Sequence, residues 1–248
     1  MGRLTPFWRT PFWLVAMVLV VLVLTGCDRS GDFENSKTGA PAEPGVKIEE
    51  VRLETTDGLT LRGNLYGQGD IGVVLAHMFP ADQSSWNDFA TELAATGDYK
   101  VLTFNFRGYG LSEGVKNIVR IDKDVQVALD HLIEETAKVY LVGASMGGTA
   151  VLKVASTRDV AGVATLSAPR DFEGLSVGDK LDQVRGAKLF IAARGDGSAP
   201  DDARSFYDSV SEPRELEIVA GEAHGTDMLE DPPNTVKDLL KNWLAKTR

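Results

Sequence analysis

One serine in this 248-residue sequence has the surroundings of a nucleophile. Ser145 is the centre of Gly143-Ala144-Ser145-Met146-Gly147, a G-x-S-x-G pattern between an apolar run at 139–142 and a helical pattern at 146–156. This strand–turn–helix context predicts a nucleophile elbow, in which a tight turn holds the serine in a strained backbone conformation. The flanking glycines let strand and helix approach closely, and the helix N-terminus offers free N–H groups to negative charge. The alternative is a tight turn in which Ser145 only caps the helix.

Three further segments accompany the elbow, and together the four resemble the α/β-hydrolase family over about residues 46–248. The three are Leu75-Ala76-His77-Met78-Phe79-Pro80, Phe106-Arg107-Gly108-Tyr109-Gly110-Leu111-Ser112 and Gly221-Glu222-Ala223-His224-Gly225. The resemblance implies an α/β-hydrolase fold and a triad whose members follow in the order serine, acid, histidine. It implies no metal and no cofactor, and it makes Ser145 the nucleophile that forms an acyl-enzyme.

The general base expected from this resemblance is His224, one of three histidines in the sequence. It follows the last expected strand, at 215–219, as the family requires. His131 lies inside an expected helix, away from any evident site. His77 ends an expected strand, at a place where family members use a histidine to shape the oxyanion loop. Position and elimination therefore both indicate His224.

The acid of the triad is expected soon after the strand at 187–193. The segment from Asp196 to Pro200 fits the family pattern of an aspartate followed by a small apolar residue and proline. Asp196 would hold the tautomer of His224 and stabilise the imidazolium ion that forms during the reaction.

Three other carboxylates compete for this role. They are Asp171, Asp201 and Asp202. The last two are expected in the first turn of the next helix, where acids are favoured by the helix dipole. The first follows the strand at 160–166, a position that some family members use for the acid.

The resemblance assigns the oxyanion hole to two backbone N–H groups, one of Met146 and one of Phe79 in the loop after His77. The family usually has glycine directly after that histidine, whereas this sequence has Met78. A different loop conformation and a side chain at the rim of the site are therefore expected. Phe79 and Trp86 are candidates for an apolar substrate wall, with packing in the core as the alternative.

The order of apolar patterns along the chain predicts an α/β fold. Alternating residues at 46–54 and 59–66, around Thr56-Asp57-Gly58, predict an N-terminal antiparallel hairpin. Short apolar runs then alternate with helical patterns, which predicts a doubly wound, mostly parallel sheet covered on both faces. Further strands are expected at 71–76, 101–106, 139–142, 160–166, 187–193 and 215–219, and helices at 84–95, 118–134, 146–156, 200–209 and 235–245.

No cap domain is expected over the site. Only residues 167–186 connect two of the expected strands, which leaves room for one helix and not for a cap. An open site suits small or extended acyl substrates. The architecture is similar to the compact, dienelactone-hydrolase-like branch of the family, with serine in place of cysteine as nucleophile. The turn Arg107–Gly110 is expected to brace the elbow without a catalytic role.

The first 26 residues are basic and apolar, with Arg3, Arg9 and no acid. Phe12–Leu24 has no polar side chain, but at about 1.5 Å per helical residue it is too short for a hydrocarbon core of about 30 Å. It fits a secretory signal of residues 1–26. The following Leu24-Thr25-Gly26-Cys27 resembles a bacterial lipoprotein signal, which implies cleavage before Cys27 and acyl chains on its thiol.

Residues 27–45 are polar and rich in glycine, proline and serine, and we expect a flexible tether that leads into a folded domain at 46–248. Asp28 resembles a signal for retention in the inner membrane of Gram-negative bacteria. The expected location is thus the extracytoplasmic face of the cell membrane, held by the lipid on Cys27. An uncleaved N-terminal anchor with an incidental cysteine is the alternative.

Composition limits the functions that remain. A hydrophobic content of 43% is sufficient for a buried core, and one cysteine excludes a disulfide framework or a cysteine-rich zinc site. The formal net charge of −10, or −12 without residues 1–26, argues against a nucleic-acid groove. The expected partner is a small acyl substrate, and the expected activity is that of a serine esterase. A peptidase or thioesterase on the same triad, or an inactive lipid-anchored binding module, are the alternatives.

Overall fold

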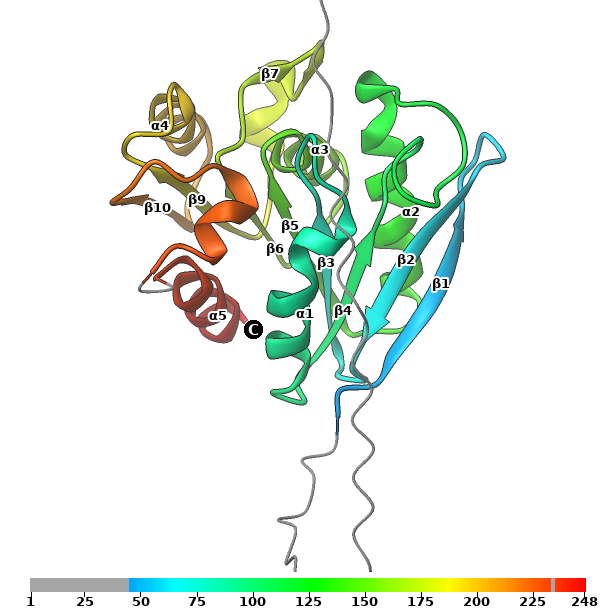
Figure 1. Ribbon diagram of the computed structural model, residues 1–248. Coiled ribbons are helices and arrows are strands. Elements are labelled where there is room, and N and C mark those ends of the chain that lie inside the picture. The colour runs from blue at the N-terminus through cyan, green and yellow to red at the C-terminus, as the bar shows by residue number, and fades with distance from the viewer. Residues whose placement is uncertain (1–44, 233–234) are drawn as a thin grey trace, which may run out of the picture. The chain divides into compact units, whose positions relative to one another are not determined.

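The computed structural model describes residues 45–232 and 235–248 (Figure 1). The predicted signal peptide, the lipid site at Cys27 and nearly all of the predicted tether lie outside these residues. No helix within the described ranges has the length and apolar character needed to cross a membrane. The chain from Glu43 to Arg248 forms one compact unit.

An eight-stranded sheet runs through this unit in the order β1-β2-β4-β3-β5-β6-β9-β10. The first two strands form the predicted antiparallel hairpin, β2 pairs antiparallel with β4, and the remaining pairs are parallel. The α/β fold with a mostly parallel sheet is therefore confirmed. The strands are β1 (Ile48–Glu54), β2 (Thr60–Tyr66), β3 (Ile71–Ala76), β4 (Tyr99–Phe104), β5 (Lys138–Ala144), β6 (Gly162–Leu166), β9 (Ala187–Ala193) and β10 (Arg214–Val219).

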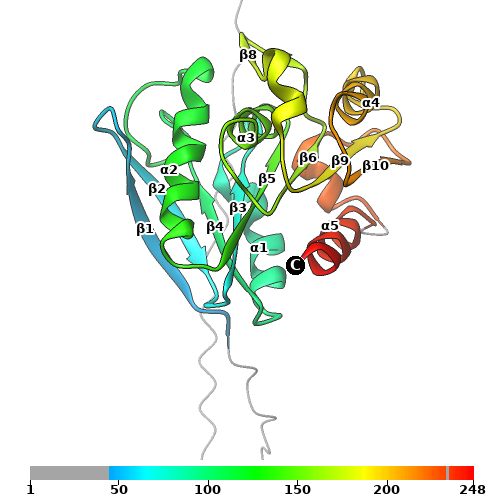
Figure 2. The same cartoon turned by 180° about the vertical axis from the view of Figure 1, so that it is seen from behind.

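Helices cover both faces of the sheet, as the alternation of patterns predicts (Figures 1 and 2). One face carries α1 (Asn87–Ala94) and α5 (Thr235–Thr247), whose buried side chains share one core cluster. The other face carries α2 (Ile121–Ile133), α3 (Met146–Ala155) and α4 (Ala199–Ser209), which share a second cluster. Short 3₁₀ helices are η1 (Gln83–Trp86), η2 (Ile118–Arg120), η3 (Gly178–Gln183) and η4 (Gly225–Leu229).

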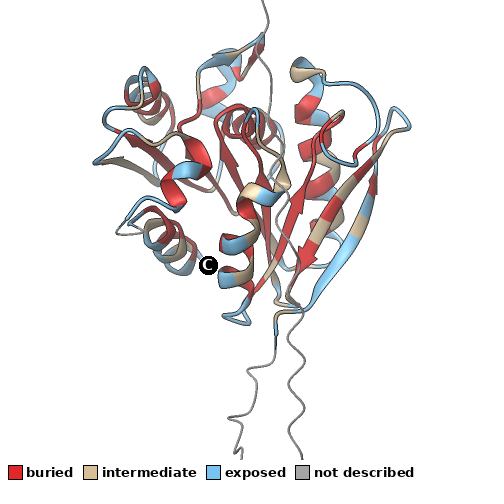
Figure 3. Ribbon diagram, viewed as in Figure 1, coloured by how far each residue is buried: buried red, intermediate tan, exposed pale blue. Residues whose placement is uncertain are grey.

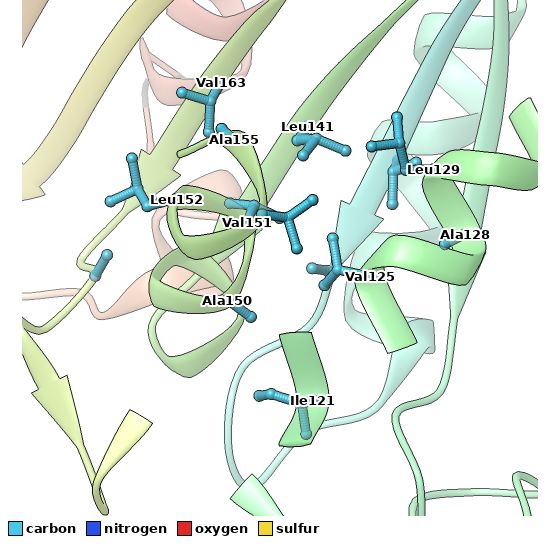
Figure 4. Close-up of a cluster of buried hydrophobic side chains, with 14 of the residues drawn as sticks. Ile121, Val125, Ala128, Leu129, Leu141, Ala150, Val151, Leu152, Ala155 and Val163 are labelled. Atoms are coloured by element: carbon cyan, nitrogen blue, oxygen red, sulfur yellow. The ribbon is translucent and has the colours of Figure 1, made fainter. Parts of the chain in front are cut away.

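The central strands are buried on both faces because successive side chains point to opposite cores (Figure 3). Leu141 of β5 packs with Val125 of α2 and Val151 of α3 in the second cluster (Figure 4). Its neighbour Tyr140 belongs to the first cluster, where its ring centroid lies 5.5 Å from that of Trp243 in α5. This arrangement explains why the strands read as continuous apolar runs in the sequence.

The connection between β6 and β9 has room for one helix but contains no α-helix. It forms a hairpin of β7 (Asp171–Phe172) and β8 (Leu175–Ser176), followed by η3. The two residues between β7 and β8 both have positive φ, 51° at Glu173 and 86° at Gly174, which an α-helix does not allow. The absence of a cap is confirmed, since this connection forms no separate layer.

Candidate active site

The carboxyl ends of the parallel strands meet at one edge of the sheet, where open α/β sheets bind their ligands. Ser145 follows β5, while Asp196 and His224 follow β9 and β10. The three side chains line one shallow cavity of about 200 Å³. The remaining lining residues come from the segment between β6 and the end of β7 and from the turn into α4 with its first residues. They are Ser167, Pro169, Phe172, Gly197, Ser198, Ala199 and Asp202.

Ser145 has the strained backbone that the elbow pattern predicts, with φ 49° and ψ −120°. Its N–H donates a 2.8 Å hydrogen bond to the carbonyl of Leu166 in the neighbouring strand, which holds the turn against the sheet. A side chain at position 147 would place its Cβ 2.5 Å from two carbonyl oxygens of the β3 end. Glycine is required at Gly147 because the helix passes directly over β3.

Asp196 and His224 form a close pair. The Nδ1 atom of His224 lies 2.9 Å from both carboxylate oxygens of Asp196. The Asp196 side chain is 13% exposed and that of His224 is 42% exposed. With Nδ1–H donating to the carboxylate, Nε2 is the ring atom left to accept a proton, and it bonds to none of the described residues.

The competing carboxylates have other partners. Asp171 is exposed and accepts a 3.1 Å hydrogen bond from the N–H of Gly174 within its own hairpin. Asp201 is exposed and pairs with Arg204 one turn along α4. Asp202 lines the cavity and accepts the hydroxyl of Ser198 at 3.3 Å. The structure thus brings Asp196, and none of these three, into contact with the imidazole of His224.

His77 occupies a different kind of environment. It is fully buried, with Nδ1 2.9 Å from the carbonyl oxygen of Met78 and Nε2 accepting the N–H of Phe106 at 3.2 Å. Burial lowers the pKa of His77 to about 4, so the ring is neutral at pH 7. Both ring nitrogens are used to connect the loops after β3 and β4, in line with the expected structural role.

The two N–H groups assigned to the oxyanion hole make no hydrogen bond within the part of the chain that the structure describes. That of Met146 stands at the first position of α3, where an α-helix has no internal acceptor. That of Phe79 lies in the loop after β3. The expected rim position of Met78 is wrong, because its side chain is 93% buried and its Sδ packs against Gly225 beside the candidate base.

The two aromatic candidates for a substrate wall lie in different environments. Trp86 is fully buried and packs against Phe89 in the core between α1 and the sheet, so for this residue the alternative of core packing holds. Phe79 is 45% exposed, and its ring centroid lies 6.1 Å from that of Phe172 in the cavity lining. Phe79 therefore stands at the rim of the cavity.

Ser167 is a cavity residue that the sequence patterns do not reveal. It follows β6, has φ 52° and is buried. Its Oγ accepts the N–H of Gly225 at 3.1 Å, which connects the end of β6 to the loop of His224. A serine with positive φ has no local sequence signal, because such a conformation is usual only for glycine and asparagine.

Arg107 connects the loop after β4 to two other elements, α2 and the β1–β2 turn, and not to the elbow itself. Its guanidinium is buried and bonds the carboxylate of Asp124 in α2 at 2.6 Å and that of Asp57 in the β1–β2 turn at 2.9 Å. The hydrogen bond from Arg107 lowers the pKa of Asp57 to about 2. In the same turn, the hydroxyl of Tyr109 lies 3.9 Å from Sδ of Met146.

Metal-ligand clusters of three or more histidine, cysteine, aspartate or glutamate residues do not occur within 45–232 and 235–248. The site as described is therefore built from a hydroxyl, an imidazole, a carboxylate and backbone N–H groups. Such a set is suited to nucleophilic acyl transfer.

Comparison with known proteins identifies the family of this chain. The profile of the alpha/beta hydrolase family matches residues 73–246. The chain therefore belongs to the alpha/beta hydrolase family and is a hydrolase. No curated protein sequence matches the chain significantly.

Solved structures share the fold at low sequence identity. An esterase from Pyrococcus furiosus superposes with a TM-score of 0.70 at 17% identity, over 81% of this chain and 91% of that one. A thermophilic esterase from Thermogutta terrifontis, solved with malate bound, gives 0.66 at 19%, over 80% and 99%. A hypothetical protein from Pseudomonas aeruginosa gives 0.69 at 15%, over 84% and 96%.

Proposed function

We propose that this protein is a serine hydrolase of carboxylic esters that works through an acyl-enzyme. The observation that carries the proposal is the pairing of His224 Nδ1 with both oxygens of Asp196, beside a strained Ser145 in the same cavity. This is the combination of base, orienting acid and nucleophile that acyl transfer needs. Three solved structures with the same fold are named esterases.

In the proposed reaction, Oγ of Ser145 attacks the ester carbonyl carbon while Nε2 of His224 takes the hydroxyl proton. The carbonyl electron pair moves to its oxygen, which the N–H groups of Phe79 and Met146 hold. Collapse of this intermediate breaks the bond to the alcohol oxygen, which leaves with the proton from His224. Water then attacks the acyl-enzyme by the same route, and Asp196 stabilises the imidazolium in both halves. One oxyanion donor contributes about 3 to 4 kcal/mol to such a transition state.

The cavity supports small or extended acyl substrates. Its volume of about 200 Å³ is below the roughly 300–1,000 Å³ of pockets that enclose a drug-sized ligand. The connection from β6 to β9 contains only a hairpin of two two-residue strands and a 3₁₀ helix. A chain attached to the reacting carbonyl can therefore extend across the surface.

The proposed location is the outer face of a bacterial membrane. The support is the apolar run Phe12–Leu24 followed by Gly26-Cys27, with acyl chains on the cysteine as anchor. Asp28 adds inner-membrane retention where an outer membrane exists. Metabolic labelling with a fatty acid tests the anchor, since the full chain should incorporate label and the Cys27→Ser variant should not.

A fluorophosphonate probe tests the catalytic proposal. We expect covalent labelling of the wild-type protein at Ser145, hydrolysis of p-nitrophenyl acetate, and loss of both in the Ser145→Ala variant. The matched control is Ser198→Ala, which removes another hydroxyl from the same cavity and should keep both signals. A folded wild-type protein that is neither labelled nor active would refute the proposal. Parallel assays on thioesters and aminoacyl amides rank the leaving group.

A further inference from the structure

Exposed apolar side chains gather at one edge of the molecule. Among the described residues, the large hydrophobic side chains with high exposure are Ile48, Phe79, Leu111, Val115, Val119 and Ile133. Four of them, which we call the mouth patch, lie in the segments that follow β3 and β4 at the active-site edge: Phe79, Leu111 and Val115 in loops and Val119 in η2. The other two stand at the start of β1 and the end of α2, which is the opposite edge.

Contacts connect the mouth patch to the cavity. The ring of Phe79 packs 6.1 Å from that of Phe172 in the cavity lining. Val119 lies against Gly174 at the tip of the same hairpin, since a Cβ added at that glycine would be 3.3 Å from a Val119 methyl. Phe79 and Val119 therefore border the cavity, whereas Leu111 and Val115 extend the patch along the loop after β4, beyond the cavity lining.

Lys116 lies within the patch, and Arg120 is the sequence neighbour of Val119. Nζ of Lys116 is 4.2 Å from the ring centroid of Tyr109 and 5.8 Å from that of Phe79. Its neighbour in sequence, Val115, is 78% exposed, and Leu111 is 83% exposed. Single exposed apolar residues are ordinary on a protein surface, whereas a group around a binding site marks an interaction surface.

We propose that the mouth patch docks on the surface of a lipid bilayer, so that the enzyme takes its ester substrates from the lipid–water interface. This inference rests on the proposed function and adds the substrate class: acyl esters of low water solubility. Apolar side chains enter the interfacial region, while Lys116 stays at the level of the headgroups on its flexible stem. Ser145 then lies just beneath the surface from which the substrate arrives.

The length of chain before the domain allows this orientation. The domain begins at the amino end of β1. Ile48 there pairs with Tyr66 of β2, and Tyr66 pairs with Val101 near the start of β4. The first strand therefore begins at the edge of the sheet opposite the site. Eighteen residues, 28–45, separate the proposed lipid site at Cys27 from the domain. At full extension they reach about 60 Å, whereas a domain of this size is about 40 Å across. A domain anchored through Cys27 can therefore turn its active-site edge toward the same membrane.

Charge favours a bilayer of neutral headgroups. Residues 27–248 carry a formal charge of −12, whereas beside the patch the carboxylates of Glu113 and Glu173 are balanced by Lys116 and Arg120. Anionic lipid would repel the domain as a whole, so apolar contact must supply the attraction. We therefore expect docking on zwitterionic phosphatidylcholine that changes little with salt.

Vesicle flotation tests the proposal with residues 43–248, the compact unit that contains the whole sheet and both cores. We expect this domain to float with phosphatidylcholine vesicles, and the Leu111→Glu/Val115→Glu variant to partition at least 10-fold less. The matched control is Ile48→Glu/Ile133→Glu, which adds the same charge to exposed apolar positions at the opposite edge and should float like wild type.

Two assays link docking to turnover. In the Leu111→Glu/Val115→Glu variant, which we call the mouth variant, hydrolysis of dissolved p-nitrophenyl acetate should stay within threefold of wild type. Hydrolysis of a long-chain ester embedded in the vesicles should fall at least 10-fold. Absence of wild-type flotation, or equal losses in both double variants, would overturn the proposal, as would sedimentation showing a dimer that only the mouth variant dissociates. Normal flotation without any ester hydrolysis would uphold docking and refute the proposed function.

Discussion

His77 and His224 both lie at the carboxyl edge of the sheet, after β3 and after β10, yet the fold uses them in opposite ways. His77 has no exposed surface and both of its ring nitrogens bond to backbone groups of two loops. His224 is 42% exposed, and only Nδ1 is engaged, by Asp196. The difference teaches that a histidine becomes a candidate base when one nitrogen is held and the other is left free toward a cavity.

Replacing His224 should give the largest effect and leave stability unchanged. We expect the His224→Ala variant to lose at least about 10⁴-fold in kcat, since no group remains to take the Ser145 proton. Its melting temperature should stay close to that of wild type because the side chain is half-exposed. Ester hydrolysis and thermal unfolding measure the two quantities. The control His131→Ala changes the histidine of α2 and should keep wild-type kcat, and an equal loss there would break the distinction between the histidines.

Removing the charge of Asp196 should give the next largest effect. The Asp196→Asn variant keeps the shape of the side chain but presents the wrong tautomer of His224 and an uncompensated imidazolium, so kcat should fall about 10³- to 10⁴-fold. The matched control is Asp202→Asn, a carboxylate of the same cavity without contact to the imidazole. Comparable losses in both variants would show that the two acids share the role.

Replacing His77 should change stability and its dependence on pH. We expect the His77→Gln variant to be about 1–3 kcal/mol less stable at pH 7, because it disturbs buried hydrogen bonds. The pKa of His77 is about 4 in the folded protein against about 6.5 in the unfolded chain, so only the unfolded state takes up the proton between these values. Wild type should therefore lose up to about 3 kcal/mol as the pH falls from 6.5 to 4, and the variant should lack this loss.

Urea unfolding at pH 7 and pH 4.5 measures this difference. The gap in unfolding free energy between wild type and the His77→Gln variant should narrow at the lower pH. Parallel pH profiles for the two proteins would show that His77 is not buried in its neutral form, and the contrast with His224 would weaken.

Of these replacements, that of Ser167 should have the smallest effect on kcat, because it acts only on the loop of His224. The Ser167→Ala variant removes the acceptor of the Gly225 N–H and should lower kcat about 3- to 10-fold by loosening the loop of His224. KM should change less, because the hydroxyl acts on the base loop and not on substrate binding. A change in KM alone would instead indicate that Ser167 contacts the substrate.

Local patterns account for most of the architecture. The strand at 187–193 and the start of the C-terminal helix at Thr235 match the prediction, because a continuous apolar run or a helical repeat reports on neighbours within one element. The strand predicted at 101–106 lies at 99–104, since Phe106 leaves the sheet to bond His77. The helix predicted at 84–95 begins as a 3₁₀ turn and becomes α-helical at Asn87.

The residues of the candidate site likewise divide into those that local sequence patterns predict and those that they do not. Ser145 is visible in the sequence because its strained turn needs glycines two residues away on each side. The positions of Met78, Trp86 and Ser167 cannot be read from local patterns, because each depends on a partner distant in the chain. The partner is Gly225 for Met78, the core under α1 for Trp86 and the His224 loop for Ser167.

The alternation of strands and helices and the elbow around Ser145 are predictable from residue types at short spacing, and the family resemblance adds the order of the expected partners. Three features depend on the tertiary structure: Asp196 is the carboxylate paired with His224, His77 is closed off from solvent, and exposed Phe79 lies beside the cavity lining. The physical reason is that burial, hydrogen-bond partners and surface patches are properties of distant segments brought together, and no local pattern encodes them.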